Sequence, residues 1–156
     1  MQGWLAEAES LRKMAKATLP AEGSAPGEYA QALLRIRAWQ DRVEELLGQA
    51  ESLRHASRRW SWDQEAAADD SFDAQVGSMK QMGQLGGDFT TGRERQAQIN
   101  LLILPQLTEA RSARRFHDEV DELLDRMRII HRGMDGARQD LSTFLRWLSW
   151  EKAMER

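Results

Sequence analysis

Arginine and aromatic residues gather at two places in this sequence. Residues 54–62 hold three arginines, a histidine and two tryptophans, and residues 111–117 hold three arginines, a phenylalanine and a histidine. Guanidinium groups bind phosphates and aromatic rings stack on bases, so this combination is typical of surfaces for single-stranded nucleic acid. The predicted nucleic-acid-binding residues are Arg54, Arg58, Arg59, Trp60, Trp62, Arg111, Arg114 and Arg115.

The same residues also have a simpler interpretation. Trp60 and Phe116 fall on the apolar stripes of their helices, as Trp39 does, and would be core residues. The arginines would then pair with the acidic residues between 63 and 73. The net charge of −3 gives the chain no general attraction to nucleic acid. Both interpretations stay open at the level of sequence.

Other patterns that carry chemistry are incomplete. His117 and Asp121 lie four residues apart on one helix face, but two ligands do not make a metal site. The sequence has no cysteine, and the glycine-containing stretch GQLGGDFTTG lacks the lysine of a phosphate-binding loop. The prediction is a protein that is not an enzyme, with no catalytic residues, metal or cofactor.

The elements that would position the arginines are long helices. Apolar residues recur at alternating steps of three and four, first from Ile36 to Trp60 and then without a miss from Ala113 to Leu148. This predicts a short helix over 3–18, a linker over 19–27, a first long arm over 28–82, a tip turn over 83–92 and a second long arm over 93–156. Pro105 should kink or break the second arm.

Two long helices joined by one short turn must fold back antiparallel. The 156 residues therefore predict one all-α domain, a long, coiled-coil-like antiparallel helical hairpin, with the short N-terminal helix packing at its open end. A turn centred near Gly87 would bring residues 54–62 opposite residues 111–117. The two groups of arginines would then share one surface.

Apolar residues that a two-helix hairpin cannot bury predict an oligomer. Around residues 99–107 they go all the way round the helix, and two tryptophans of the second arm lie off its apolar stripe. The predicted contacts between subunits are Leu101, Leu102, Ile103, Leu104, Leu107, Trp147 and Trp150.

The sequence also predicts a cytoplasmic protein. No stretch approaches the roughly 20 apolar residues that span a bilayer, and the N-terminal residues are unlike a signal peptide. The excess of arginine over lysine and the high alanine content indicate a GC-rich coding sequence, bacterial or phage. A phage-encoded protein would act in the cytoplasm of its host.

The second half of the chain resembles a known family. The run DELLDRMRIIHRGMDGARQDLSTFLRWLSWE, after TTGRERQAQINLL, is similar in layout to phage recombination mediators of the UvsY type. Arg132–Gly133 and the spacing of Arg138, Leu141, Leu145 and Arg146 carry the likeness, over roughly residues 28–156. The resemblance implies an oligomer that binds single-stranded DNA and helps load a recombinase onto strands covered by single-strand-binding protein.

A second hypothesis belongs to a different class. A structural or adaptor coiled coil, such as a phage or bacterial assembly factor or inhibitor, would act through protein contacts alone. It predicts no affinity for nucleic acid and a partner that covers Leu101 to Leu107 or the face of Trp147 and Trp150.

Overall fold

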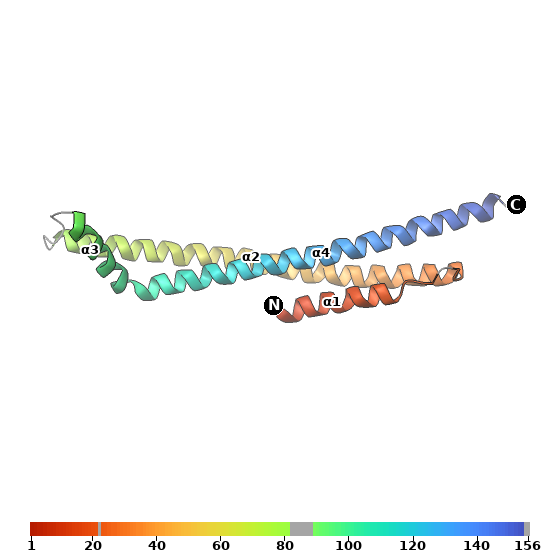
Figure 1. The fold of residues 1–156 in the computed structure, drawn as a ribbon, viewed down its shortest axis with the longest axis horizontal. Helices are drawn as coiled ribbons and strands as arrows, with labels where there is room; N and C mark the ends of the chain where they lie inside the picture. Colours follow the sequence, from red (N-terminus) through yellow and green to blue (C-terminus); the bar gives the residue numbers. More distant parts are fainter. Residues whose placement is uncertain (22, 82–88, 155–156) are drawn as a thin grey trace. The chain divides into compact units, whose positions relative to one another are not determined.

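The computed structural model describes residues 1–21, 23–81 and 89–154. Over these residues the chain forms helices and no strand, which confirms the predicted fold class. The helices are α1 (Gln2–Ala17), α2 (Pro26–Gln81), α3 (Phe89–Leu102) and α4 (Leu104–Met154), as Figure 1 shows. None of these helices has the length and apolar character needed to cross a bilayer.

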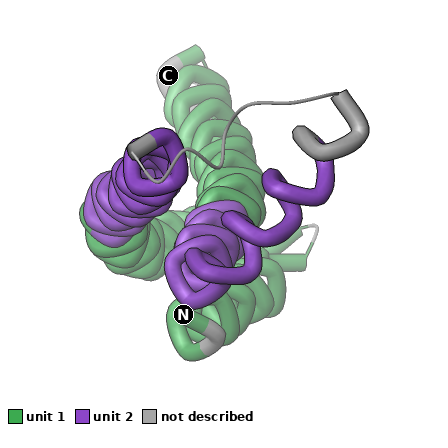
Figure 2. The backbone as a smooth tube through the Cα atoms, turned by 90° about the vertical axis from the view of Figure 1, so that its left-hand side faces the viewer, with its two compact units in different colours: residues 1–52, 121–156 green, residues 53–120 purple. Residues whose placement is uncertain are grey.

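The chain divides into two compact units, which Figure 2 colours separately. Unit 1 comprises Met1–Ser52 and Asp121–Arg156, and unit 2 comprises Leu53–Val120. Each unit contains a part of α2 and a part of α4.

In unit 1 the helices α2 and α4 pack side by side in opposite directions (Figure 1). Tyr29, near the start of α2, contacts Phe144, with ring centroids 4.7 Å apart. Glu51, further along α2, accepts a hydrogen bond from Arg128 of α4 at 3.2 Å. Residue numbers therefore rise along one helix as they fall along the other, which confirms the antiparallel hairpin.

Helix α1 completes a three-helix core in unit 1. Ala8, Leu11 and Ala15 form its buried stripe, at the helical spacing of three and four residues. They pack with buried residues of α2 and α4, among them Ile36, Val43, Leu46, Leu124, Met127 and Met134.

Ion pairs hold the outer edges of α1. Arg42 of α2 donates a hydrogen bond to Glu7 at 2.8 Å and another to Glu45 at 2.8 Å. The bonds to Glu7 and then to Glu45 raise the pKa of Arg42 above its ordinary value. Arg126 of α4 reaches Glu9 at 3.3 Å. Helix α1 therefore packs against both arms at the open end, as the sequence predicts.

A polar layer crosses the core of unit 1. Gln40 is buried, and its amide donates to Asp135 Oδ1 at 3.3 Å and lies 3.4 Å from His131 Nε2. His131 in turn lies 3.0 Å from Glu44. Gln40 is therefore the residue that is buried in the core between Ile36 and Val43. The prediction that Trp39 fills the core is wrong in part, because Trp39 packs only partly buried beside the cluster.

Helix α2 starts two residues before the predicted arm, and hydrogen bonds hold the linker that precedes it. Pro26 opens α2, where its missing N–H costs no helical hydrogen bond. Tyr29 donates its hydroxyl to the carbonyl of Ala21 at 2.9 Å. Gly23 has a φ of 86°, a left-handed conformation that glycine adopts without strain.

The break in the second arm lies at Ile103, and it divides the arm into α3 and α4. Pro105 falls in the first turn of α4 and cannot donate to Leu101, so the helical hydrogen bonds are interrupted there. Bonds from Ile103 to Ile99 and from Leu107 to Ile103 flank the interruption. Within unit 2, Figure 1 shows α3 turning away from the axis of α4 at this point.

The tip turn predicted over 83–92 overlaps the start of helix α3. Residues 82–88 lie outside the described residues, and helix α3 already begins at Phe89, before the predicted start at 93.

The core of unit 1 predicts a clear contrast between two leucines of α2. Leu46 is 1% exposed, so Leu46→Ala should lower the free energy of unfolding by about 2–5 kcal/mol. Leu34 is 64% exposed, and Leu34→Ala should change it by no more than about 0.5 kcal/mol. Urea denaturation followed by circular dichroism would measure both. Equal losses would contradict the three-helix core.

Candidate nucleic-acid interface

Small side chains line the contact between α2 and α4 in unit 2. The buried positions include Ser57, Ser61 and Ala68 on α2 and Ala110 and Ala113 on α4. The distance between packed helices follows the size of the side chains at their contact. These small residues let the two helices approach closely, so larger residues must lie at the flanks.

A hydrogen bond between the helices fixes their register in unit 2. The Oγ of Ser57 lies 3.1 Å from Nδ1 of His117 and 2.9 Å from the carbonyl oxygen of Arg54. Because a hydroxyl has one hydrogen, which goes to that carbonyl, Nδ1–H of His117 is the donor to Ser57. His117 is half-buried, and this hydrogen bond joins it to α2.

Trp60 is not the core residue that its place in the heptad predicts. Its side chain is 39% exposed and packs edge-on against Phe116, with ring centroids 6.1 Å apart. Ser61 takes the buried position instead. Trp60 and Trp62 are separated by about 200° around the helix, so they flank Ser61 on opposite sides.

One side of the contact contains a hollow with arginines from both helices. We call this cavity of about 260 Å³ the Trp62 hollow. Its lining residues are Arg58, Ser61, Trp62, Glu65, Arg114, His117 and Asp118. The guanidinium carbon of Arg58 lies 4.5 Å from the centroid of the Trp62 ring, which holds the cation over the indole face.

The structure therefore brings together three of the eight predicted nucleic-acid-binding residues, Arg58, Trp62 and Arg114. Arg59, Arg111 and Arg115 are exposed but do not line the Trp62 hollow, and Arg54 is half-buried. Trp60 lies on the other side of the contact. The other four lining residues, Ser61, Glu65, His117 and Asp118, are not among the predicted residues. Placing Ser61 rather than Trp60 on the contact would have found Ser61 and Glu65, which lie four residues apart on one face of α2.

Within the described part of the chain, the exposed arginines in the two groups of unit 2 lack the acidic partners that some of the arginines of unit 1 have. In unit 1, Arg42, Arg126 and Arg128 all form ion pairs. Among the described residues, no ion pair forms at the five exposed arginines of unit 2's two groups, Arg58, Arg59, Arg111, Arg114 and Arg115, or at the acidic residues between 63 and 73. The pairing that the simpler interpretation requires is not seen there.

The predicted subunit contacts fall in different units. In unit 2, Leu101, Leu102 and Leu104 are exposed around the helix break, and Leu107 is half-buried. Ile103 is 3% exposed, so its inclusion in a surface patch is wrong. In unit 1, Trp147 and Trp150 are exposed, and Trp147 stacks on Phe144 with centroids 6.0 Å apart.

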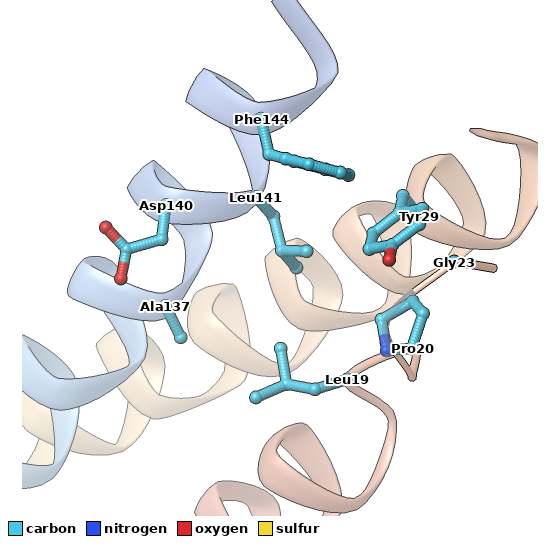
Figure 3. Close-up of a pocket in the computed structure, with 8 residues that line it drawn as sticks. All are labelled: Leu19, Pro20, Gly23, Tyr29, Ala137, Asp140, Leu141 and Phe144. Carbon is cyan, nitrogen blue, oxygen red and sulfur yellow. The ribbon is translucent and has the colours of Figure 1, made fainter. Parts of the chain in front are cut away.

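Unit 1 also has an apolar pocket of about 590 Å³, drawn in Figure 3. The linker contributes Leu19, Pro20 and Gly23, and Tyr29 comes from α2. The α4 residues that line it are Ala137, Asp140, Leu141 and Phe144. In Figure 3 Asp140 points away from Pro20 and Tyr29, so the floor of the pocket is apolar.

The part of the chain that the structure describes has no group of three or more His, Asp or Glu residues that could hold a metal ion. His117 and Asp121 are not joined there by a third ligand.

Comparisons of the chain with protein-family models, curated proteins and solved structures found no match. The resemblance to UvsY-type mediators therefore stays a prediction.

The small-residue contact of unit 2 predicts that a larger side chain is not tolerated there. Ser61 is 4% exposed, so Ser61→Leu should lower the free energy of unfolding by about 1–3 kcal/mol through overpacking. Ser52→Leu, at an exposed position of the same helix, is the matched control and should be nearly neutral. Thermal denaturation would compare the two. A Ser61→Leu protein as stable as its control would show that the helices leave space at this contact.

Proposed function

We propose that this protein is a non-enzymatic accessory factor that binds single-stranded nucleic acid through the Trp62 hollow. The observation that carries the proposal is the convergence of Arg58 and Trp62 of α2 with Arg114 of α4 on one cavity. Two cations and an exposed aromatic ring at one site provide what a nucleotide requires, a phosphate contact beside a stacking surface.

The geometry of Arg58 and Trp62 supports stacking at the edge of the cavity. Trp62 is 57% exposed, although Arg58 covers one part of its ring. A base can stack on the open indole surface while the guanidinium of Arg58 contacts the adjoining phosphate. Arg114 approaches from the other helix, so the phosphate would lie between two cations.

The carboxylates of Glu65 and Asp118 restrict how a strand would lie. They repel phosphate, so the backbone would stay on the side of Arg58 and Arg114. Carboxylates also accept hydrogen bonds from amino groups of bases, such as N4 of cytosine. A base that carries an amino group would therefore face Glu65 and Asp118.

The biological role that we propose is that of a recombination mediator. This role rests on the resemblance of residues 28–156 to UvsY-type proteins and on the arginine surface described above. The protein would act in the cytoplasm as a homo-oligomer, with a recombinase or a single-strand-binding protein as its partner.

Loss of the two cations should weaken binding of single-stranded DNA and reduce its dependence on salt. Replacing Arg58 and Arg114 together with Ala removes two phosphate contacts. The plot of the logarithm of affinity against the logarithm of salt concentration has a negative slope. Its magnitude should decrease by about 1.4, at about 0.7 per lost contact. Fluorescence anisotropy of a labelled oligonucleotide, at several salt concentrations, would measure it. In the same assay, Trp62→Ala should weaken binding by about 1–3 kcal/mol through lost stacking.

Arg35 and Arg132 provide the matched control. Both are exposed, they lie on the same two helices, and neither lines the Trp62 hollow. The double change of Arg35 and Arg132 to Ala alters the net charge equally but should leave the slope almost unchanged. No binding by the unaltered protein at low salt, or equal losses in the two double variants, would refute the proposed function.

A second candidate function is that of an adaptor that acts through protein contacts alone. The specific observation in its favour is the exposure of Leu101, Leu102 and Leu104 around the helix break. Exposed apolar residues that adjoin one another are typical of protein interfaces.

The mass in solution tests this second candidate. A self-associating chain should sediment above its monomer mass of 17.9 kDa, and Leu101→Asp with Leu104→Asp should return it to that mass. Leu34→Asp, at an exposed position in unit 1, is the control and should leave the assembly intact. A monomer in the unaltered protein, with no shift on addition of single-stranded DNA, would count against both candidates.

A further inference from the structure

A second polar cavity lies in unit 1, between α2 and α4. This cavity of about 360 Å³, which we call the three-arginine hollow, shares no lining residue with the pocket drawn in Figure 3. Its lining residues are Arg37 of α2 and Arg138, Gln139, Ser142, Thr143 and Arg146 of α4. On α4 these residues follow one another at steps of one, three, one and three, which places them on a single helix face.

The lining of the three-arginine hollow is unusual in its charge. Three arginines line it together with two hydroxyl residues and a glutamine, and no carboxylate is among the lining residues. The Trp62 hollow, by contrast, contains Glu65 and Asp118, and the apolar pocket contains Asp140. Of these three cavities, only this one has no carboxylate in its lining, although Asp135 beside it pairs with Arg138 and accepts a hydrogen bond from Gln139 at 3.0 Å.

The arginines of this hollow are held in different ways. Arg138 donates to Asp135 at 2.7 Å, and Asp135 also accepts from Gln40 in the polar layer of the core. This arginine is therefore anchored to the core of unit 1. Arg37 and Arg146 are exposed, and within the described residues neither forms an ion pair. Two guanidinium groups, one from each helix, thus remain available beside an anchored third.

The chemistry of the lining selects the ligand. Arginine is always charged, and its planar fork of N–H donors matches the oxygens of a phosphate group. The hydroxyls of Ser142 and Thr143 add donors on the same helix face. A monovalent halide would use one or two of these groups, whereas a tetrahedral oxyanion can accept from several at once.

We propose that the three-arginine hollow is a binding site for a phosphate group, contacted by Arg37, Arg138 and Arg146. This site is independent of the Trp62 hollow, since it belongs to unit 1 and shares no residue with it. It does not depend on the proposed function. The phosphate group can belong to a small molecule, such as a nucleotide, or to a nucleic-acid strand, and both present the same oxygens to the arginines.

The test is a titration of the full chain with pyrophosphate, observed by NMR at the arginine Nε–H groups. The unaltered protein should show saturable shifts at Arg37, Arg138 and Arg146. Arg37→Gln with Arg146→Gln should weaken binding, read from Arg138, by about tenfold, because each removes a charge-assisted hydrogen bond. Arg35→Gln with Arg132→Gln removes the same charge from the same helices outside the hollow and should bind like the unaltered protein.

Two outcomes would overturn the proposal. One is the absence of saturable shifts at these arginines with pyrophosphate when an equal ionic strength of chloride is the reference. The other is an equal loss in the two double variants, which would indicate a general effect of charge. Circular dichroism of both variants should match that of the unaltered protein, since all four substituted residues are exposed.

The same two variants identify the source of the phosphate. If a single strand supplies it, Arg37→Gln with Arg146→Gln should also weaken binding of a labelled oligonucleotide relative to the control pair. If a small molecule supplies it, affinity for the oligonucleotide should be the same in both variants while pyrophosphate binding differs. A protein that binds pyrophosphate here but no oligonucleotide would refute the proposed function and support this site.

Discussion

Gln40 and its partners on α4 set the alignment on which the other contacts of unit 1 depend. The amide of Gln40 is buried between turns that carry Ile36 and Val43, and it reaches His131 and Asp135. Sliding one helix past the other would leave these polar groups against apolar side chains, and each unpaired group costs about 1–3 kcal/mol. A buried polar residue in a helical seam can thus specify one register among several of similar packing. The meeting of Arg37 with Arg138 and Arg146 follows from that register.

In unit 2 the hydrogen bond between Ser57 and His117 sets the register of α2 against α4. The side chains at this contact differ in size from those of unit 1. At the contact of Ser57, Ser61 and Ala68 with Ala110 and Ala113 the buried residues are short, so less apolar area is removed from water there than at the leucines and methionines of unit 1. The long side chains, Arg58, Trp62 and Arg114, are displaced to the flank, where they form a cavity instead of a core. The small residues at this contact therefore have two effects. They bury little apolar area, and they leave the long polar and aromatic side chains exposed at its flank.

The sequence predicts the fold well because hydrophobic periodicity and a single turn leave only one way to pair long helices. It predicts individual burial less well. Steps of three and four are interchangeable within a heptad pattern, so Trp39 and Trp60 fit the stripe as well as Gln40 and Ser61 do. The packing of neighbouring helices determines which of these residues is buried. In unit 1 the third helix, α1, enlarges the core, and in unit 2 small residues shorten the distance between α2 and α4. The three-arginine hollow could not be predicted, because Arg37 and Arg146 are distant in sequence and neither stands out by its neighbours.

The short connection between α1 and α2 has a consequence for how unit 1 holds together. Only residues 18–25 connect α1 to α2. The hydrogen bond from the Tyr29 hydroxyl to the carbonyl of Ala21 further shortens the part of this connection that is not held. A short tether gives an attached segment an effective concentration in the millimolar range. Docking of α1 is therefore insensitive to dilution of the protein, and a free helix of the same sequence would have to be present at a comparable concentration to displace it.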